Sequence, residues 1–161
     1  MINSEILKLR KELHQNPELS GKEFNTTQRI KKFIEKHNPT NFIENVGGNG
    51  FIAVYKFSET GKTITIRCEL DALPIEEENG FDYKSNTKGV SHKCGHDGHM
   101  AIVAGLIFWI KKQSFKSGKI VLLFQPAEET GQGAFNVMND DRFRNLNSDY
   151  IFALHNIPGE S

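Results

Sequence analysis

Five residues in the second half of the chain have side chains that could bind a metal ion and activate water. They are Cys94, His96, Glu128, Glu129 and His155. A thiolate and an imidazole two residues apart, with Gly95 between them to permit a tight bend, can converge on one ion. Sulfur and nitrogen ligands beside carboxylates favour zinc, nickel, cobalt or manganese over magnesium or calcium. A lone Cys-x-His is more often a buried cysteine next to a histidine at a helix start, so the prediction of a metal site depends on the other candidates.

The adjacent glutamates suggest a division of labour. One carboxylate can bind the ion while its neighbour, held off the ion, takes a proton from the attacking water as general base. Spacing alone leaves open which glutamate has which role. The alternative is a solvated acidic pair at a helix N-terminus, where carboxylates are favoured.

Other histidines and aspartates flank these candidates. Asp71 and Asp97 could each orient a ligand histidine from the second shell of the site, although a plain turn aspartate is the alternative for both. His155 follows an apolar strand, where an isolated histidine is usually a core residue, and the neighbouring candidates favour a ligand instead. His99 lies one helical turn beyond His96, and we expect it to pack or hydrogen-bond near the site rather than bind metal. Cys68 is expected in the core.

The periodicity of apolar residues predicts an α/β domain with a mixed, mostly parallel sheet flanked by helices. Helices are expected at residues 4–14, 21–37, 96–112 and 131–138. Strands are expected at residues 41–46, 51–57, 63–70, 118–125 and 150–154, with residues 74–93 forming a long loop. In open α/β sheets, ligands bind beyond the carboxyl ends of strands. Asp71, the glutamate pair and His155 each follow a predicted strand, so we expect them on one rim of the sheet.

Composition limits the class of protein. The 161 residues suffice for one domain, and 20 basic residues balance 20 acidic ones, so no basic face argues for nucleic acid. The longest apolar run, residues 100–110, is far below the roughly 20 residues that span a bilayer. The N-terminus has no pattern of a secretory signal, and two cysteines make no disulfide framework. A cytoplasmic protein without a membrane partner is expected.

Four blocks resemble one known family. Residues 67–75 (RCELDALPI), 91–99 (SHKCGHDGH), 124–129 (FQPAEE) and 154–155 (LH) are similar to the sequence blocks of the aminoacylase/hippurate hydrolase family of metal-dependent amidohydrolases. This family includes N-acyl-amino-acid amidohydrolases and the hydrolases of indole-acetyl-amino-acid conjugates, and is related to zinc carboxypeptidases. Residues 9–19 (LRKELHQNPEL) also resemble its opening helix. The resemblance covers nearly the whole chain.

The resemblance implies a zinc-exopeptidase-like catalytic domain and a defined set of roles. Cys94, His96, Glu129 and His155 are then metal ligands, and Glu128 is the general base. The complete enzymes hold two divalent ions and hydrolyse the amide bond of N-acyl amino acids such as hippurate.

The chain departs from the family pattern at two residues and in length. Glu69 replaces the usual aspartate and Lys93 the usual small residue. Family members are more than twice as long, with an inserted lid or dimerisation domain and a later histidine ligand. We therefore expect residues 1–161 to be the N-terminal portion of a catalytic domain, with dimers possible only in a full-length form. The alternative function is an inactive, truncated remnant that still binds metal.

Overall fold

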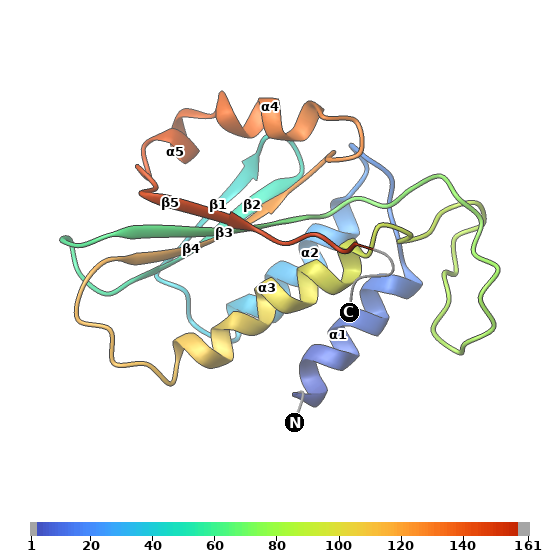
Figure 1. Ribbon diagram of the computed structural model, residues 1–161, viewed down its shortest axis with the longest axis horizontal. Helices are drawn as coiled ribbons and strands as arrows, with labels where there is room; N and C mark the ends of the chain where they lie inside the picture. The colour runs from blue at the N-terminus through green and yellow to red at the C-terminus, as the bar shows by residue number, and fades with distance from the viewer. Residues whose placement is uncertain (1–2, 158–161) are drawn as a thin grey trace.

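The structure is a computed structural model that describes residues 3–157, and its centre is one five-stranded sheet (Figure 1). The strand order is β1-β2-β4-β3-β5. β2 pairs antiparallel with both β1 and β4, whereas β3 pairs parallel with both β4 and β5. The strands are β1 (Asn41–Val46), β2 (Gly50–Lys56), β3 (Thr63–Glu69), β4 (Lys119–Gln125) and β5 (Tyr150–Ala153).

Helices cover both faces of the sheet. α1 (Ser4–Gln15), α2 (Phe24–Glu35) and α3 (His96–Ile110) lie on one face, and the short α4 (Gln132–Met138) and α5 (Asp141–Arg144) lie on the other (Figure 1). α3 is apolar nearly all round, and it packs both against the sheet and against the other two helices of its layer. Within the described residues, no helix has the length and apolar composition needed to cross a bilayer.

The sequence predicted most of these elements. The mixed α/β sheet flanked by helices is confirmed, and the predicted strand and helix ranges agree with the structure to within three residues. Two of the four strand pairings are parallel, a lower share than expected, because the hairpin β1–β2 joins the sheet through an antiparallel pairing with β4. α5 was not predicted. β5 is exposed at all four residues, because it is the edge strand and neither helical layer extends over it.

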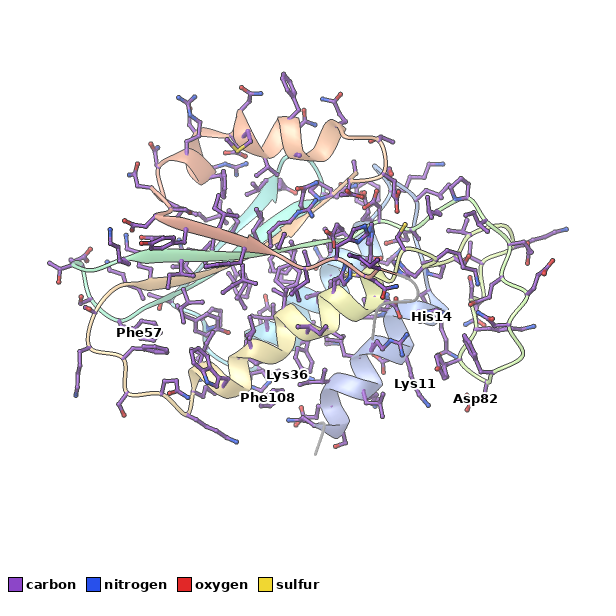
Figure 2. The ribbon with its side chains drawn as sticks, in the orientation of Figure 1. Lys11, His14, Lys36, Phe57, Asp82 and Phe108 are labelled. Atoms are coloured by element: carbon purple, nitrogen blue, oxygen red, sulfur yellow. The ribbon has the colours of Figure 1, made fainter. Side chains whose placement is uncertain are left out.

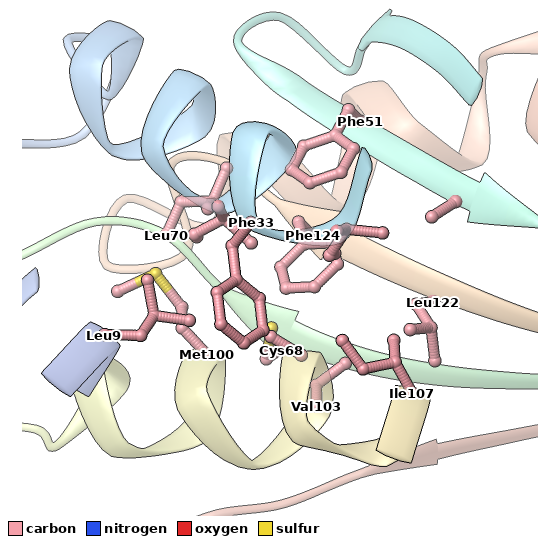
Figure 3. Close-up of a cluster of buried hydrophobic side chains, with 14 of the residues drawn as sticks. Leu9, Phe33, Phe51, Cys68, Leu70, Met100, Val103, Ile107, Leu122 and Phe124 are labelled. Carbon is pink, nitrogen blue, oxygen red and sulfur yellow. The ribbon is translucent and has the colours of Figure 1, made fainter. Parts of the chain in front are cut away.

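The larger core lies between the sheet and the three helices of the first layer. Phe51 of β2 and Phe124 of β4 stack there with ring centres 4.6 Å apart, and both are completely buried (Figure 3). Ile107 of α3 and Leu122 of β4 are also fully buried in this cluster. This packing fixes α3 against β4, and therefore fixes the start of α3 near the carboxyl end of the strands.

Replacing Phe124 with Ala should lower the free energy of unfolding by about 3–5 kcal/mol, because it removes a buried ring and leaves a cavity against Phe51. Urea unfolding followed by circular dichroism measures the change. Phe135→Ala is the matched control, because Phe135 on α4 is 66% exposed, and it should shift the value by no more than about 0.5 kcal/mol. Equal effects of the two substitutions would contradict this placement of the core.

A buried ionic network holds the long loop, residues 74–93, to the helices. His14 lies at the end of α1 beside this loop (Figure 2). Its Nδ1 contacts Asp97 Oδ2 at 2.9 Å, and its Nε2 contacts Glu77 Oε1 at 3.1 Å. Because ionised carboxylates only accept hydrogen bonds, both ring nitrogens donate and His14 is an imidazolium. Glu77 also accepts from the Ser85 backbone N–H at 2.6 Å, so His14 connects α1, the start of α3 and the loop.

This network predicts a stability maximum in mildly acidic solution. The hydrogen bond to Asp97 raises the pKa of His14 above 6.5. The contribution of His14 to the free energy of unfolding is therefore complete below pH 6.5, and it is lost as the pH rises through the pKa of His14 in the folded state. Burial opposes ionisation of Glu77, but bonds from Ser85, Asn79 and His14 lower its pKa to about 2. The contribution of Glu77 is therefore complete above pH 4.5 and is lost as the pH falls toward 2.

Urea unfolding across pH 4 to 9 measures this profile. His14→Gln should flatten the decline on the alkaline side, while His37→Gln, which removes a histidine outside the network, should leave that decline in place. A wild-type profile that rises steadily from pH 5 to 8 would contradict the assignment.

Candidate metal centre

Three of the predicted ligands converge in the structure. Cys94, His96 and Glu129 each offer one ligand atom, and these atoms lie within 4.8 Å of one another. His96 is 2% exposed, while Cys94 and Glu129 are partly buried. Cys94 and His96 are close in sequence at the start of α3, whereas Glu129 comes from the segment after β4, so the fold brings Glu129 to the other two.

The start of α3 orients His96. Gly95 precedes the helix with φ +82°, a conformation in which a residue with a side chain is strained. His96 Nδ1 donates to the backbone oxygen of Asp71 at 2.8 Å, which leaves Nε2 as the nitrogen that faces the site. Nε2 lies 3.7 Å from Glu128 Oε2 and also 3.7 Å from Glu129 Oε1. Both glutamates therefore reach the volume in front of this nitrogen.

The segment after β4 is held from two sides. Ala127 has φ +48°, and its backbone N–H donates to the buried carboxylate of Glu23 at 2.8 Å. The N–H of Glu129 donates to Asp71 Oδ2 at 3.0 Å. Gly133 completes the turn, because a Cβ there would lie 1.6 Å from the backbone oxygen of Pro126. These contacts set the direction of the adjacent glutamates.

The charges in the site favour a cation. Burial, together with Glu129 and Glu128, raises the pKa of the Cys94 thiol to about 11. Burial opposes ionisation of Asp71, but His96, Ser20 and the Glu129 N–H lower its pKa to about 2, so Asp71 is anionic. Glu129 Oε1 is buried and has no hydrogen-bond partner among the described residues. A divalent ion would satisfy this oxygen and stabilise the thiolate, so the donor set fits a metal.

The two aspartates proposed for the second shell have different surroundings. Asp71 contacts the site directly, through its backbone oxygen to His96 and its carboxylate to the Glu129 backbone. Asp97 instead accepts from His14 Nδ1 and from Arg10 Nε, at 2.9 and 3.0 Å. Asp97 therefore connects the start of α3 to α1, and it does not hydrogen-bond to the side chain of a predicted ligand.

His155 is not part of the group formed by Cys94, His96 and Glu129. It is exposed after β5, and its ring centre lies 6.0 Å from that of His99. His99 is 5% exposed and donates from Nδ1 to Glu69 Oε2 at 2.8 Å, as expected for a histidine that hydrogen-bonds near the site. Glu69, His96 and His99 form a second buried group with ligand atoms within 4.8 Å of one another. The metal-ligand role of His155 remains a prediction.

Sequence reasoning missed several buried polar residues around the centre. Glu69 was noted only as a departure from the family pattern, although its spacing of two residues from Asp71 at the end of a strand places both on one side. Neither His14 nor His92 was predicted to have a role at the site. His92 is 5% exposed, burial lowers its pKa to about 4, and neither ring nitrogen has a hydrogen-bond partner among the described residues.

Curated proteins of similar sequence include an N-acetyl-L-cysteine deacetylase and a hippurate hydrolase. The chain is 41% identical over 158 residues to an N-acetyl-L-cysteine deacetylase of Bacillus subtilis, and it covers 37% of that protein. It is 35% identical over 157 residues to a hippurate hydrolase of Campylobacter jejuni, of which it covers 40%. In both matches 98% of this chain is aligned. The chain thus spans about two fifths of the length of these relatives.

Solved structures and a family profile agree with this relationship. A Bacillus subtilis protein described as a dinuclear metal-binding peptidase of the M20 family superimposes with a TM-score of 0.86 at 34% identity. The match covers 97% of this chain and 43% of that protein. The sequence profile of peptidase family M20/M25/M40 matches residues 65–161, which contain all the candidate site residues. The chain therefore belongs to peptidase family M20/M25/M40.

Proposed function

We propose that this protein takes part in metal-dependent hydrolysis of the amide bond of N-acyl amino acids, with two divalent ions and Glu128 as general base. The observation that carries the proposal is that Cys94, His96 and Glu129 converge beside a second carboxylate, that of Glu128. The proposed ions are zinc, manganese, nickel or cobalt, since the site combines sulfur, nitrogen and oxygen donors.

The substrate class rests on the relatives. N-acetyl-L-cysteine deacetylase and hippurate hydrolase are both named for cleavage of an acyl group from an amino acid. The two acyl groups differ, an acetyl in one name and a benzoyl in the other, so the shared chemistry is the amide bond and the amino acid. Hippurate-like substrates are therefore proposed for this protein as well.

The protein residues have separate roles in this mechanism. Cys94, His96, Glu129 and His155 would hold the ions, which supply a nucleophilic water at neutral pH and stabilise charge on the substrate carbonyl oxygen. The Glu128 side chain is 38% exposed, compared with 20% for Glu129, so Glu128 is the more open of the pair toward solvent and substrate. Glu128 would take the proton of the attacking water and return it to the leaving amine.

A thiol mechanism has less support. A nucleophilic cysteine needs a lowered pKa, usually next to a cation. Burial, together with the surrounding carboxylates, instead raises the pKa of Cys94 to about 11. In this setting Cys94 is suited to be a metal ligand and unsuited to attack a carbonyl without a metal.

One observation favours the alternative, a chain that binds metal without catalysing. His155, a proposed ligand, and the whole of β5 are exposed to solvent. Exclusion of water strengthens the electrostatic interactions on which hydrolysis depends.

Hippurate hydrolysis with added Mn²⁺ or Zn²⁺ tests the proposed function. If the protein cleaves hippurate, Glu128→Gln should lower kcat by about 10²- to 10⁴-fold while metal affinity stays unchanged. Glu129→Gln is the matched variant and should weaken metal binding. Full activity in Glu128→Gln would contradict its assignment as base, and metal binding without hydrolysis by the wild-type chain would favour the alternative.

Metal should also stabilise the folded chain. Zn²⁺ present at 100 times its dissociation constant should raise the free energy of unfolding by about 2.7 kcal/mol, because it binds the folded site. Thermal unfolding with Zn²⁺ and with a chelator measures the effect. Cys94→Ser should greatly reduce the stabilisation by Zn²⁺. Cys68→Ser, a substitution in the core, should leave the stabilisation by Zn²⁺ unchanged in the molecules that fold. An identical shift in Cys94→Ser would exclude Cys94 as a ligand.

A further inference from the structure

Glu23 is a completely buried carboxylate directly before α2, and it does not cap that helix. Its side chain makes no capping hydrogen bond, although it occupies the capping position. The residues preferred there are serine, threonine, aspartate and asparagine. Glu18 supplies the cap instead, because it accepts from the backbone N–H groups of Asn25 and Thr26 at 3.2 and 2.7 Å. The carboxylate of Glu23 is therefore available for contacts elsewhere in the chain.

Three N–H groups outside α2 donate to this carboxylate. Its Oε1 accepts from the backbone N–H groups of Gly21 and Ala127, both at 2.8 Å, and its Oε2 accepts from Asn49 Nδ2 at 3.0 Å. Asn49 lies in the turn between β1 and β2, and Ala127 follows β4, 104 positions after Glu23. A buried carboxylate is costly unless it is hydrogen-bonded, so Glu23 holds these segments to the start of α2.

Ala127 depends on such contacts because its backbone is strained. Its φ of +48° lies in the left-handed region, which a residue with a Cβ adopts only at a cost. Such a conformation persists where the surrounding structure enforces it. Glu23 accepts from the N–H of Ala127, and the N–H of Gly133 donates to the backbone oxygen of Ala127 at 3.0 Å. Both sides of the strained residue are thus held.

The strained residue directly precedes the proposed general base. Within the described part of the chain, the carboxylate of Glu128 accepts no hydrogen bond, and its Oε2 lies 3.7 Å from His96 Nε2. The direction of Glu128 is therefore set by the backbone that carries it, which begins at Ala127. Glu129 follows in the same turn, so the turn also sets where its carboxylate can meet a metal ion.

We infer that Glu23 is a positioning residue for the proposed reaction. Through the N–H of Ala127 it fixes the turn that directs Glu128 and Glu129 toward the volume in front of His96. This inference rests on the proposed function, because it concerns the base and one ligand of that mechanism. Glu23 acts through the backbone and has no hydrogen bond to a proposed ligand among the described residues.

Substitutions at Glu23 separate the bond to Ala127 from the buried charge. Glu23→Gln keeps Oε1 for the N–H groups of Gly21 and Ala127, and its amide can donate to a rotated Asn49 side chain. Glu23→Asp keeps the carboxylate but is one methylene shorter, so it no longer reaches Ala127. Glu23→Ala removes every contact. Glu18→Ala is the matched control, because its carboxylate bonds to the start of α2 and, among the described residues, to none after β4.

Calorimetric titration with Co²⁺, and hippurate hydrolysis at saturating Co²⁺, test the inference in the whole chain. Glu23→Ala and Glu23→Asp should bind Co²⁺ about 10-fold more weakly and lower kcat by about 10- to 100-fold, with KM unchanged. Glu23→Gln should match the wild type in both measurements, and so should Glu18→Ala. If the wild type binds Co²⁺ without cleaving hippurate, the Co²⁺ affinities alone decide.

The outcomes separate the inference from the proposed function. Wild-type values in Glu23→Ala, or equal losses in Glu18→Ala, would overturn the inference. A Glu23→Gln variant as impaired as Glu23→Ala would also overturn it, because the charge rather than the bond to Ala127 would then matter. If circular dichroism shows that Glu23→Ala does not fold, Glu23→Asp decides, and wild-type affinity in that variant overturns the inference. A wild type that binds no Co²⁺ would contradict the proposed function itself, and the inference with it.

Discussion

The candidate metal centre depends on one buried anion just after β3. Asp71 is completely buried, and its Oδ2 accepts from Ser20 Oγ at 2.6 Å and from the Glu129 N–H at 3.0 Å. Its backbone oxygen accepts from His96. A buried charge is costly unless it is hydrogen-bonded, so moving either segment that donates to Oδ2 would expose part of that cost, while the backbone oxygen holds the start of α3. Asp71 therefore couples the segment after α1, the start of α3 and the segment after β4.

The sequence contained enough information to predict the layers but not which surfaces they leave uncovered. The apolar runs of β4 and α3 predicted buried elements, and both are in the core. The run at β5 is also largely apolar but is exposed, because an edge position depends on strand order rather than on the strand's own residues. α5 has only four residues, too few for a helical period.

The candidate site was predictable where its residues follow strands, and not where they meet only in space. The rule that ligands gather at the carboxyl ends of strands predicted the grouping of Asp71 with the glutamate pair, and family resemblance suggested how the pair divides its roles. The contacts of His14 with Asp97 and of Glu69 with His99 join residues 83 and 30 positions apart. No local pattern in a single sequence indicates such pairs.

The edge position of β5 also bears on how the protein behaves in concentrated solution. Among the described residues, β5 pairs only with β3, so its other side presents free backbone groups next to exposed Tyr150, Ile151 and Phe152. Uncovered edges of this kind readily join strands of other molecules. The sequence carries no net charge at neutral pH, so long-range repulsion does not keep molecules apart. Colloidal stability therefore depends on what covers this short edge, and a buffer away from neutrality would reduce self-association by charging the whole surface.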